Sequence, residues 1–299
     1  MPHVLLIFID GIGLGPDDPA INPFAAFGPC WGLDRSLTQS GIGAHAAAEV
    51  VATDATLGIP GLPQSATGQS ALLTGVNTAR LLGRHLSAYP NEKLKTCLSE
   101  NGIFTWCRGQ GLSATFANGY RREYWEMVER GKLRHSATTL SVLGAQGRLR
   151  GEEDFAAGEA VYHDITGHFL RLLGREVPLL TPQAAAQRLA GLAERHDFTL
   201  FEFFLTDLVG HRGHWDQARP LLERLDGLLT TLVERLDLRE TALLIASDHG
   251  NFENLSVPAH TLNPVPTILY GPTARKIADS IHSLTDILPG IKRLLLEGH

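Results

Sequence analysis

The sequence predicts an α/β fold, in which a mostly parallel sheet is flanked by helices within a single domain over residues 1–299. Short apolar runs alternate with amphipathic stretches, which is the pattern of repeated β-α-β units. Three of the apolar runs end next to an aspartate, as strands do when their carboxyl ends carry ligands. The chain has 299 residues, of which 43% are hydrophobic and 19% charged, so it can bury the core of one large α/β domain.

Five apolar runs are expected to be strands, because each is short and bounded by polar or turn-forming residues. The run before Asp10 is expected to be the first buried strand. The runs cover residues 4–9, 112–117, 198–205, 241–246 and 265–270.

Four amphipathic stretches are expected to be helices. Thr181 and Pro182 read as an N-cap followed by proline at the first helical position. Leucines recur on one helical face between residues 219 and 236. The expected helices cover residues 70–86, 181–194, 219–236 and 284–296.

Residues 121–177 have a different character. They are rich in Arg, Glu and Gly, and their apolar residues follow a less regular period. We expect this segment to form a small lid or reduced cap inserted in the core, or else a set of long connections.

The charge and cysteine content exclude several classes of protein. A net charge of -6 and a pI near 6.1 argue against a nucleic-acid or anionic-membrane partner. Cys30, Cys97 and Cys107 are widely spaced and form no CxxC pair, so neither a disulfide framework nor a thiolate zinc site is expected. The N-terminal apolar run lacks a cleavage site, and no run is long enough to span a bilayer. We therefore expect a reduced, cytoplasmic protein, and nothing in the sequence specifies its oligomeric state.

Aspartate and histidine residues follow three of the expected strands. Because the carboxyl ends of parallel strands meet at one edge of a sheet, these side chains are expected to converge there. Carboxylate and imidazole groups are preferred ligands of Zn²⁺ and Mn²⁺, and this set suffices for two divalent ions. The candidate ligands are Asp10, Asp207, His211, Asp248, His249 and His260, with the three histidines expected on the loops after the strands.

A stretch of small and hydroxyl residues, 61–75, precedes a helical pattern. Ser65 or Thr67 is expected at or just before the N-terminus of that helix, where backbone N–H groups and the helix dipole stabilise an anion. A serine hydroxyl beside a metal ion is a competent nucleophile. The alternative is an ordinary N-cap in a glycine-rich turn.

Together these motifs resemble the alkaline phosphatase superfamily. Within it, the metalloenzyme branch of cofactor-independent phosphoglycerate mutase and phosphopentomutase is the best match, and the last two motifs are the most specific. The resemblance rests on DGIG (residues 10–13), SATGQSALLTG (65–75), TDLVGH (206–211), SDHGN (247–251) and HTLNPVP (260–266).

The resemblance implies a single metalloenzyme domain with two catalytic divalent ions, Mn²⁺ or Zn²⁺, and a small phosphorylated substrate. Ser65 would attack phosphorus and form a phosphoenzyme, with Thr67 as the fallback nucleophile. One ion would be held by Asp10, Asp248, His249 and Ser65, and the other by Asp207, His211 and His260.

The chain departs from the mutases at two places. Gln69 stands where the mutases have a histidine, and residues 121–177 are shorter than their substrate-binding cap. A mutase must hold its substrate and exclude water, so a reduced cap favours hydrolysis of a phosphate ester. The alternatives are a phosphomutase acting on a phosphosugar or phosphoglycerate, and a non-catalytic metal-binding protein that retains the fold.

Four further residues are candidates for substrate contact. Arg212 and His214 flank the TDLVGH motif, Asn22 lies in a loop after the first strand, and Gln69 follows the glycine of the serine segment. A surface or turn role explains each of them equally well.

Overall fold

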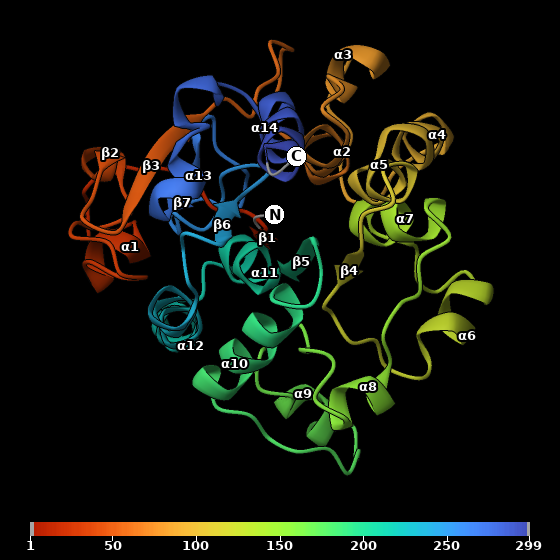
Figure 1. Ribbon diagram of the computed structural model, residues 1–299. Coiled ribbons are helices and arrows are strands. Elements are labelled where there is room, and N and C mark those ends of the chain that lie inside the picture. Colours follow the sequence, from red (N-terminus) through yellow and green to blue (C-terminus); the bar gives the residue numbers. More distant parts are fainter. Residues whose placement is uncertain (1–2, 298–299) are drawn as a thin grey trace.

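The structure is a computed structural model that describes residues 3–297, and its centre is a seven-stranded mixed sheet (Figure 1). The strand order is β2-β3-β7-β6-β1-β5-β4. The strands are β1 (His3–Ile9), β2 (Gly43–Ala44), β3 (Ala48–Thr53), β4 (Ala114–Phe116), β5 (Phe198–Phe203), β6 (Thr241–Ala246) and β7 (Val265–Tyr270).

Four neighbouring strands, β6, β1, β5 and β4, are parallel, so the predicted fold class is confirmed. In register, Val4 of β1 lies between Phe198 of β5 and Ala242 of β6, and the three strands therefore end at the same edge. All five predicted strands are present. The antiparallel addition of β7, β3 and β2 at one side was not predicted.

Helices cover both faces of the sheet (Figure 1). One layer contains α2 (Ser65–Thr74), α4 (Glu92–Asn101), α5 (Ile103–Gly109), α7 (Ala137–Gly144) and α14 (Ile287–Leu296), and the other contains α10 (Pro182–Ala193) and α12 (Trp215–Arg235). The remaining helices are α1 (Pro23–Phe27), α3 (Thr78–Leu82), α6 (Tyr124–Glu129), α8 (Glu152–Ala156), α9 (His168–Leu172), α11 (Leu205–Arg212) and α13 (Gly271–Arg275).

The first strand shows why its sequence is continuously apolar. Alternate residues, beginning with Leu5, pack into the core below α10 and α12, whereas Val4 and its alternates pack under α2, α5 and α14. Because both faces are covered, every position from Val4 to Ile9 is buried.

The predicted helices at 181–194, 219–236 and 284–296 are present, with shifted ends. The side chain of Thr181 accepts a hydrogen bond from Ala184 N, as an N-cap should, and Pro182 is the first helical residue. The predicted helix over 70–86 is confirmed only in part, because the span is divided between α2 and α3. The chain forms α2 from Ser65 and leaves the helix at Gly75, whose φ of 70° is the left-handed conformation that ends helices.

The boundary at the end of β5 also differs from the prediction. The strand ends at Phe203, not at residue 205, and α11 begins at Leu205. Asp207 and His211 consequently lie one helical turn apart on α11, where an i, i+4 pair shares a face. His211 was expected on a loop, and that expectation was wrong.

Residues 121–177 are divided between two environments. Helix α7 belongs to the main helical layer, with Ala137 and Val142 in the same core cluster as α2 and α5. Helices α6, α8 and α9 lie around the β4 side of the sheet (Figure 1). A small separate cluster there contains Phe155, Tyr162 and Leu170.

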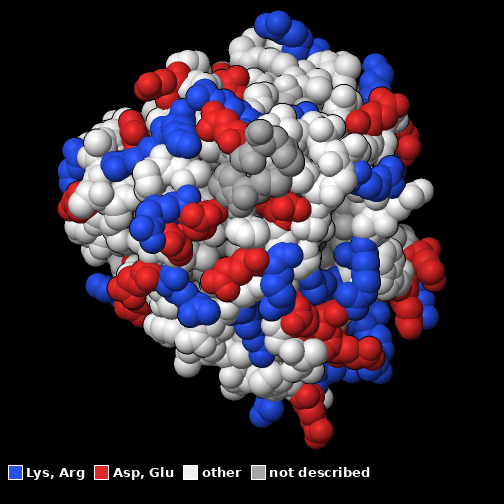
Figure 2. Space-filling model, viewed as in Figure 1, with Lys and Arg blue, Asp and Glu red and all other residues white. Residues whose placement is uncertain are grey.

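The surface carries a mixture of charges on the face drawn in Figure 2, where acidic and basic side chains are interspersed. Within residues 3–297, no helix combines the length and apolar character that crossing a bilayer requires. The three cysteines are buried and unpaired.

Candidate metal centre and nucleophile

The first group of candidate ligands forms where β1 and β6 end. Asp10 follows β1, and Asp248 and His249 follow β6, which lies beside β1. Nε2 of His249 lies 3.3 Å from Oδ1 of Asp10 and 3.5 Å from Oδ2 of Asp248. The three side chains therefore aim their donor atoms at one point.

Ser65 faces the same point. It is the first residue of α2, and its Oγ lies 3.0 Å from Nε2 of His249. Thr67 is fully buried, and its hydroxyl donates to the carbonyl oxygen of Gln64. Of the two hydroxyl groups considered, the one on Ser65 is directed at the ligand group.

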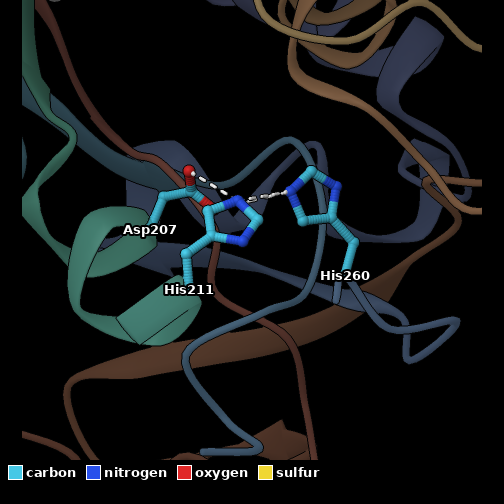
Figure 3. Close-up of side chains that lie close together, drawn as sticks. All are labelled: Asp207, His211 and His260. Atoms are coloured by element: carbon cyan, nitrogen blue, oxygen red, sulfur yellow. Dashed lines mark hydrogen bonds and ion pairs between the residues drawn. The ribbon is translucent and has the colours of Figure 1, made fainter. Parts of the chain in front are cut away.

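The second group is Asp207, His211 and His260 (Figure 3). Nε2 of His211 lies 3.4 Å from Oδ2 of Asp207 and 3.1 Å from Nε2 of His260. Nδ1 of His211 contacts the carbonyl oxygen of Pro258 at 2.7 Å, and Nδ1 of His260 contacts that of Pro63 at 2.7 Å. These contacts place the proton of each ring on Nδ1 and leave Nε2 free to bind a metal.

The two groups of candidate ligands are adjacent. The rings of His249 and His260 stack with their centroids 3.7 Å apart. Gly11 passes between the groups with a φ of 73°, and its N–H donates to Oδ1 of Asp248. A Cβ at this position would lie 2.8 Å from Cβ of Asp207, so only glycine allows the approach.

The electrostatics of the first group fit a divalent cation. Burial, reinforced by Asp248 and Asp207, raises the pKa of Asp10 well above its usual value, and burial with Asp207 raises the pKa of Asp248 to about 7. Oδ1 of Asp10 and Oδ2 of Asp248 are buried without a hydrogen-bond partner. Burial lowers the pKa of His249 to about 3, which keeps the ring neutral, as a metal ligand must be. Closely spaced carboxylates whose oxygens lack hydrogen-bond partners, together with a neutral imidazole, form a suitable site for a divalent ion such as Zn²⁺ or Mn²⁺.

Two residues of the loop after β6, which were not singled out in the sequence, support this arrangement. Asn251 donates from Nδ2 to Oδ1 of Asp207 at 2.7 Å. The carboxylate of Glu253 is fully buried and accepts from the backbone N–H groups of Gly13 and Asn251, and also from the side chains of Thr261 and Asn263. One carboxylate thus ties the loop after β1 to two parts of the loop between β6 and β7, and both loops carry candidate ligands. Asn251 lies within the SDHGN motif, so its position was an available signal.

Glu202, on β5, is a further acidic residue near the first group. It is buried, and its side chain accepts a hydrogen bond from the hydroxyl of Thr138 on α7. Burial, opposed by the Thr138 hydrogen bond and reinforced by Asp248, raises the pKa of Glu202 to about 7. In the sequence, Glu202 stands out as the one acidic residue within the strand Phe198–Phe203.

The four residues expected to contact substrate have different surroundings. Gln69 is buried and donates from Nε2 to Oδ2 of Asp10 at 3.1 Å, so its amide holds a ligand side chain. Asn22 is fully buried, and its side chain caps α1 by accepting a hydrogen bond from Phe24 N. The expected contact between Asn22 and substrate is therefore wrong. Arg212 and His214 are exposed at the end of α11 and the start of α12.

Part of the chain is similar to known proteins. Residues 178–297 match the family model of the Metalloenzyme superfamily, and this range contains Asp207, His211, Asp248, His249 and His260. The 2,3-bisphosphoglycerate-independent phosphoglycerate mutase of Agrobacterium fabrum is 34% identical over 112 residues, which is 35% of this chain and 22% of the mutase. The enzyme of the same name from Cereibacter sphaeroides is 25% identical over 256 residues, 81% of this chain and 45% of the mutase. The chain therefore spans less than half the length of these curated relatives.

Solved structures share the fold over nearly their whole length. The PH0037 protein from Pyrococcus horikoshii superposes with a TM-score of 0.58 at 16% identity, covering 98% of this chain and 96% of that one. The alkaline phosphatase from the Antarctic bacterium TAB5 has a TM-score of 0.51 at 11% identity, covering 99% and 98%. Residues 178–297 are thus similar to the Metalloenzyme superfamily, and the chain shares its fold with an alkaline phosphatase, so family match, relatives and fold all point to the metalloenzyme branch of the alkaline phosphatase superfamily.

Proposed function

We propose that this protein transfers phosphoryl groups with the help of two divalent ions, Mn²⁺ or Zn²⁺, and that it hydrolyses a phosphate ester of a small molecule. The observation that carries the proposal is the position of the Ser65 hydroxyl, 3.0 Å from Nε2 of His249 at the N-terminus of α2. A nucleophile, an anion-stabilising helix end and two ligand groups are gathered in one place.

The ligand sets suggest how the ions would be held. Asp10, Asp248 and His249 would bind one ion beside Ser65, and Asp207, His211 and His260 would bind the other. When bound, such ions activate a hydroxyl nucleophile and neutralise the charge that develops on a transferring phosphoryl group.

Ser65 would perform the chemical step. Its Oγ would lose its proton and form a bond to phosphorus while the bond to the leaving oxygen breaks, and the departing alcohol would take up one proton in exchange. The first N–H groups of α2 are placed to stabilise the negative charge on the phosphoryl oxygens. In hydrolysis, water would then attack the phosphoserine, release inorganic phosphate and restore the hydroxyl.

The openness of the second group supports hydrolysis. The side chain of His211 is 42% exposed, so water reaches this side of the group directly. We propose that the parts of residues 121–177 outside α7 form only a reduced cap. A cap of this size would retain a phosphorylated intermediate poorly, because α7 is committed to packing in the core.

A phosphomutase is the second candidate, and the names of the curated relatives favour it. The two candidates differ in their products. Metal-loaded protein should be incubated with phosphomonoesters, phosphodiesters, phosphosugars and 3-phosphoglycerate, and both inorganic phosphate and isomers should be measured. Phosphate release supports hydrolysis, whereas an isomer without phosphate release establishes the mutase instead.

The covalent step has its own test. Ser65→Ala should abolish turnover while metal content stays near that of the wild type, and Thr67→Val is the matched control that should keep activity. Mass spectrometry of acid-quenched reactions should find the phosphoryl group on Ser65. Full activity of Ser65→Ala, or no product from any substrate in the presence of bound metal, would reject the proposed role, the latter in favour of a non-catalytic metal-binding protein.

A further inference from the structure

A second concave site lies at the edge of the sheet, away from the ligand groups. It is a cavity of about 300 Å³ between α5, β4 and the loop that follows α7. Its floor is apolar and continuous with the main core, since Phe104, Phe116 and Val142 belong to that core cluster. The volume is at the lower end of the range for sites that bind small molecules.

Three arginines line this cavity, and none of the described lining residues is acidic. Arg148 is paired with Asp154. Arg108 donates only to neutral oxygens, namely Ala145 O and the side chain of Gln146, both at 2.9 Å. The charges of Arg108 and Arg150 therefore have no ion-pair partner within the described residues.

Arg150 has the most unusual surroundings of the three. Its Nη2 donates to Oγ1 of Thr115 at 2.8 Å, whereas its Nε is buried without a hydrogen-bond partner. Burial lowers the pKa of Arg150, although Asp154 acts in the opposite direction. The Nε–H group of Arg150 is therefore a buried hydrogen-bond donor without an acceptor.

The cavity is remote from the candidate metal centre. The cavity is lined by the start of β4. There Ala114 pairs with Phe198 of β5, and Phe198 pairs in turn with Val4 of β1. Asp10 lies six residues further along β1, a distance of about 20 Å at the usual rise of a strand. A small molecule bound in the cavity would not reach the candidate metal-binding residues.

We propose that this cavity is a separate binding site for a small organic anion with an apolar body. A carboxylate or phosphate group would accept hydrogen bonds from the guanidinium groups of Arg150 and Arg108, and the hydrocarbon part would rest on Phe104, Leu112 and Phe116. Such an anion neutralises two arginine charges that have no ion-pair partner within the described residues. Figure 2 shows several basic side chains near the position that β4 occupies in Figure 1.

The test uses 2-naphthoate as the probe, with the metal-loaded protein saturated with inorganic phosphate to fill the proposed catalytic site. Isothermal titration should detect binding, and the neutral 2-naphthalenemethanol and inorganic sulfate should each bind at least about tenfold more weakly, since each lacks one of the two recognised parts. Arg150→Met should weaken 2-naphthoate binding at least about tenfold through loss of a charge-assisted hydrogen bond.

The matched control is Arg219→Met, which removes an exposed arginine on α12 in the opposite helical layer. It should leave the affinity unchanged. Arg108→Met is the second cavity variant, in case Arg150→Met does not fold. Equal affinity in a folded cavity variant and the wild type, or equal binding of the neutral alcohol, would overturn the proposal. None of these outcomes tests the proposed phosphoryl transfer, which is measured separately with phosphorylated substrates.

Discussion

Asn251 donates a hydrogen bond of 2.7 Å to Oδ1 of Asp207, and so links the loop after β6 to a ligand candidate on α11. The same amide nitrogen lies 3.3 Å from the backbone oxygen of Asp207. The carboxylate of Asp207 therefore has a fixed orientation, with its other oxygen, Oδ2, directed toward His211. A hydrogen bond of this kind decides how well a ligand is presented to a metal.

Replacing Asn251 should therefore weaken the second ligand group. Asn251→Ala is expected to lower metal affinity or kcat/KM by about 10- to 100-fold, as is usual when the partner of a metal ligand is removed. Metal titration and steady-state kinetics measure the effect. Asn254→Ala, three residues along the same loop, is the control and should behave as the wild type. Unchanged metal affinity in a folded Asn251→Ala protein would contradict a supporting role.

Glu253 should matter for stability, because its buried carboxylate accepts hydrogen bonds from Gly13 N, Asn251 N, Thr261 and Asn263. Glu253→Gln replaces one accepting oxygen with an NH₂ group that faces other donors. We expect the free energy of unfolding to fall by about 2 to 4 kcal/mol, as measured by urea denaturation. Glu234→Gln, on the exposed side of α12, should change it by less than about 0.5 kcal/mol. A change at Glu253 no larger than this control would show that the network is not structural.

The central fold could be predicted from the sequence because its signals are local. The strands 241–246 and 265–270 have the predicted bounds, since each is mostly apolar and buried at every position. The short strand β2 was missed because two residues, Gly43–Ala44, carry no period that a pattern can show. The break of the 70–86 helix was missed because glycine also occurs inside helices. The structure shows that Gly75 adopts the left-handed conformation that ends α2, and that Asn77 caps the start of α3.

The candidate ligands could also be found from the sequence, because Asp10, Asp207 and Asp248 all follow neighbouring strands whose ends must meet. The contacts that support these ligands could not be found from the sequence, even where the residues lie in recognisable motifs. The contact between Gln69 and Asp10 joins residues 59 positions apart, and only the placement of α2 beside β1 creates it. The role of Asn22 as a helix cap depends likewise on the loop that surrounds it.

The cysteines should be chemically inert in the folded protein. Burial raises the pKa of Cys107 to about 12, raises that of Cys97, and raises that of Cys30 far above its usual range. Thiolate, the reactive form, is therefore scarce at pH 8. We expect negligible reaction with Ellman's reagent under native conditions and titration of three thiols in guanidinium chloride. Rapid labelling of the native protein would contradict the buried positions.

The same shifts define a dependence of stability on pH. The unfolded thiols lose protons near their ordinary pKa, whereas the folded ones keep them to higher pH. Between these values the unfolded state binds fewer protons, so the free energy of unfolding should fall as pH rises above about 8.5. Cys107→Ala should make this alkaline decline shallower in denaturation measured from pH 7 to 11. An equally steep decline in the variant would assign it to other groups.

Metal binding should stabilise the fold, because Asp10 and Asp248 are buried side by side and repel each other when ionised. Removing metal with a chelator should lower Tm, and adding Mn²⁺ or Zn²⁺ should raise it in proportion to the logarithm of the ion concentration. Asp248→Asn removes one of the opposed charges, so the metal-free variant should melt above the metal-free wild type. The variant should also gain much less from added ions, since it lacks a ligand oxygen. A metal-free variant that melts lower, or one that gains as much from added metal as the wild type, would show that Asp248 is not part of a cation site.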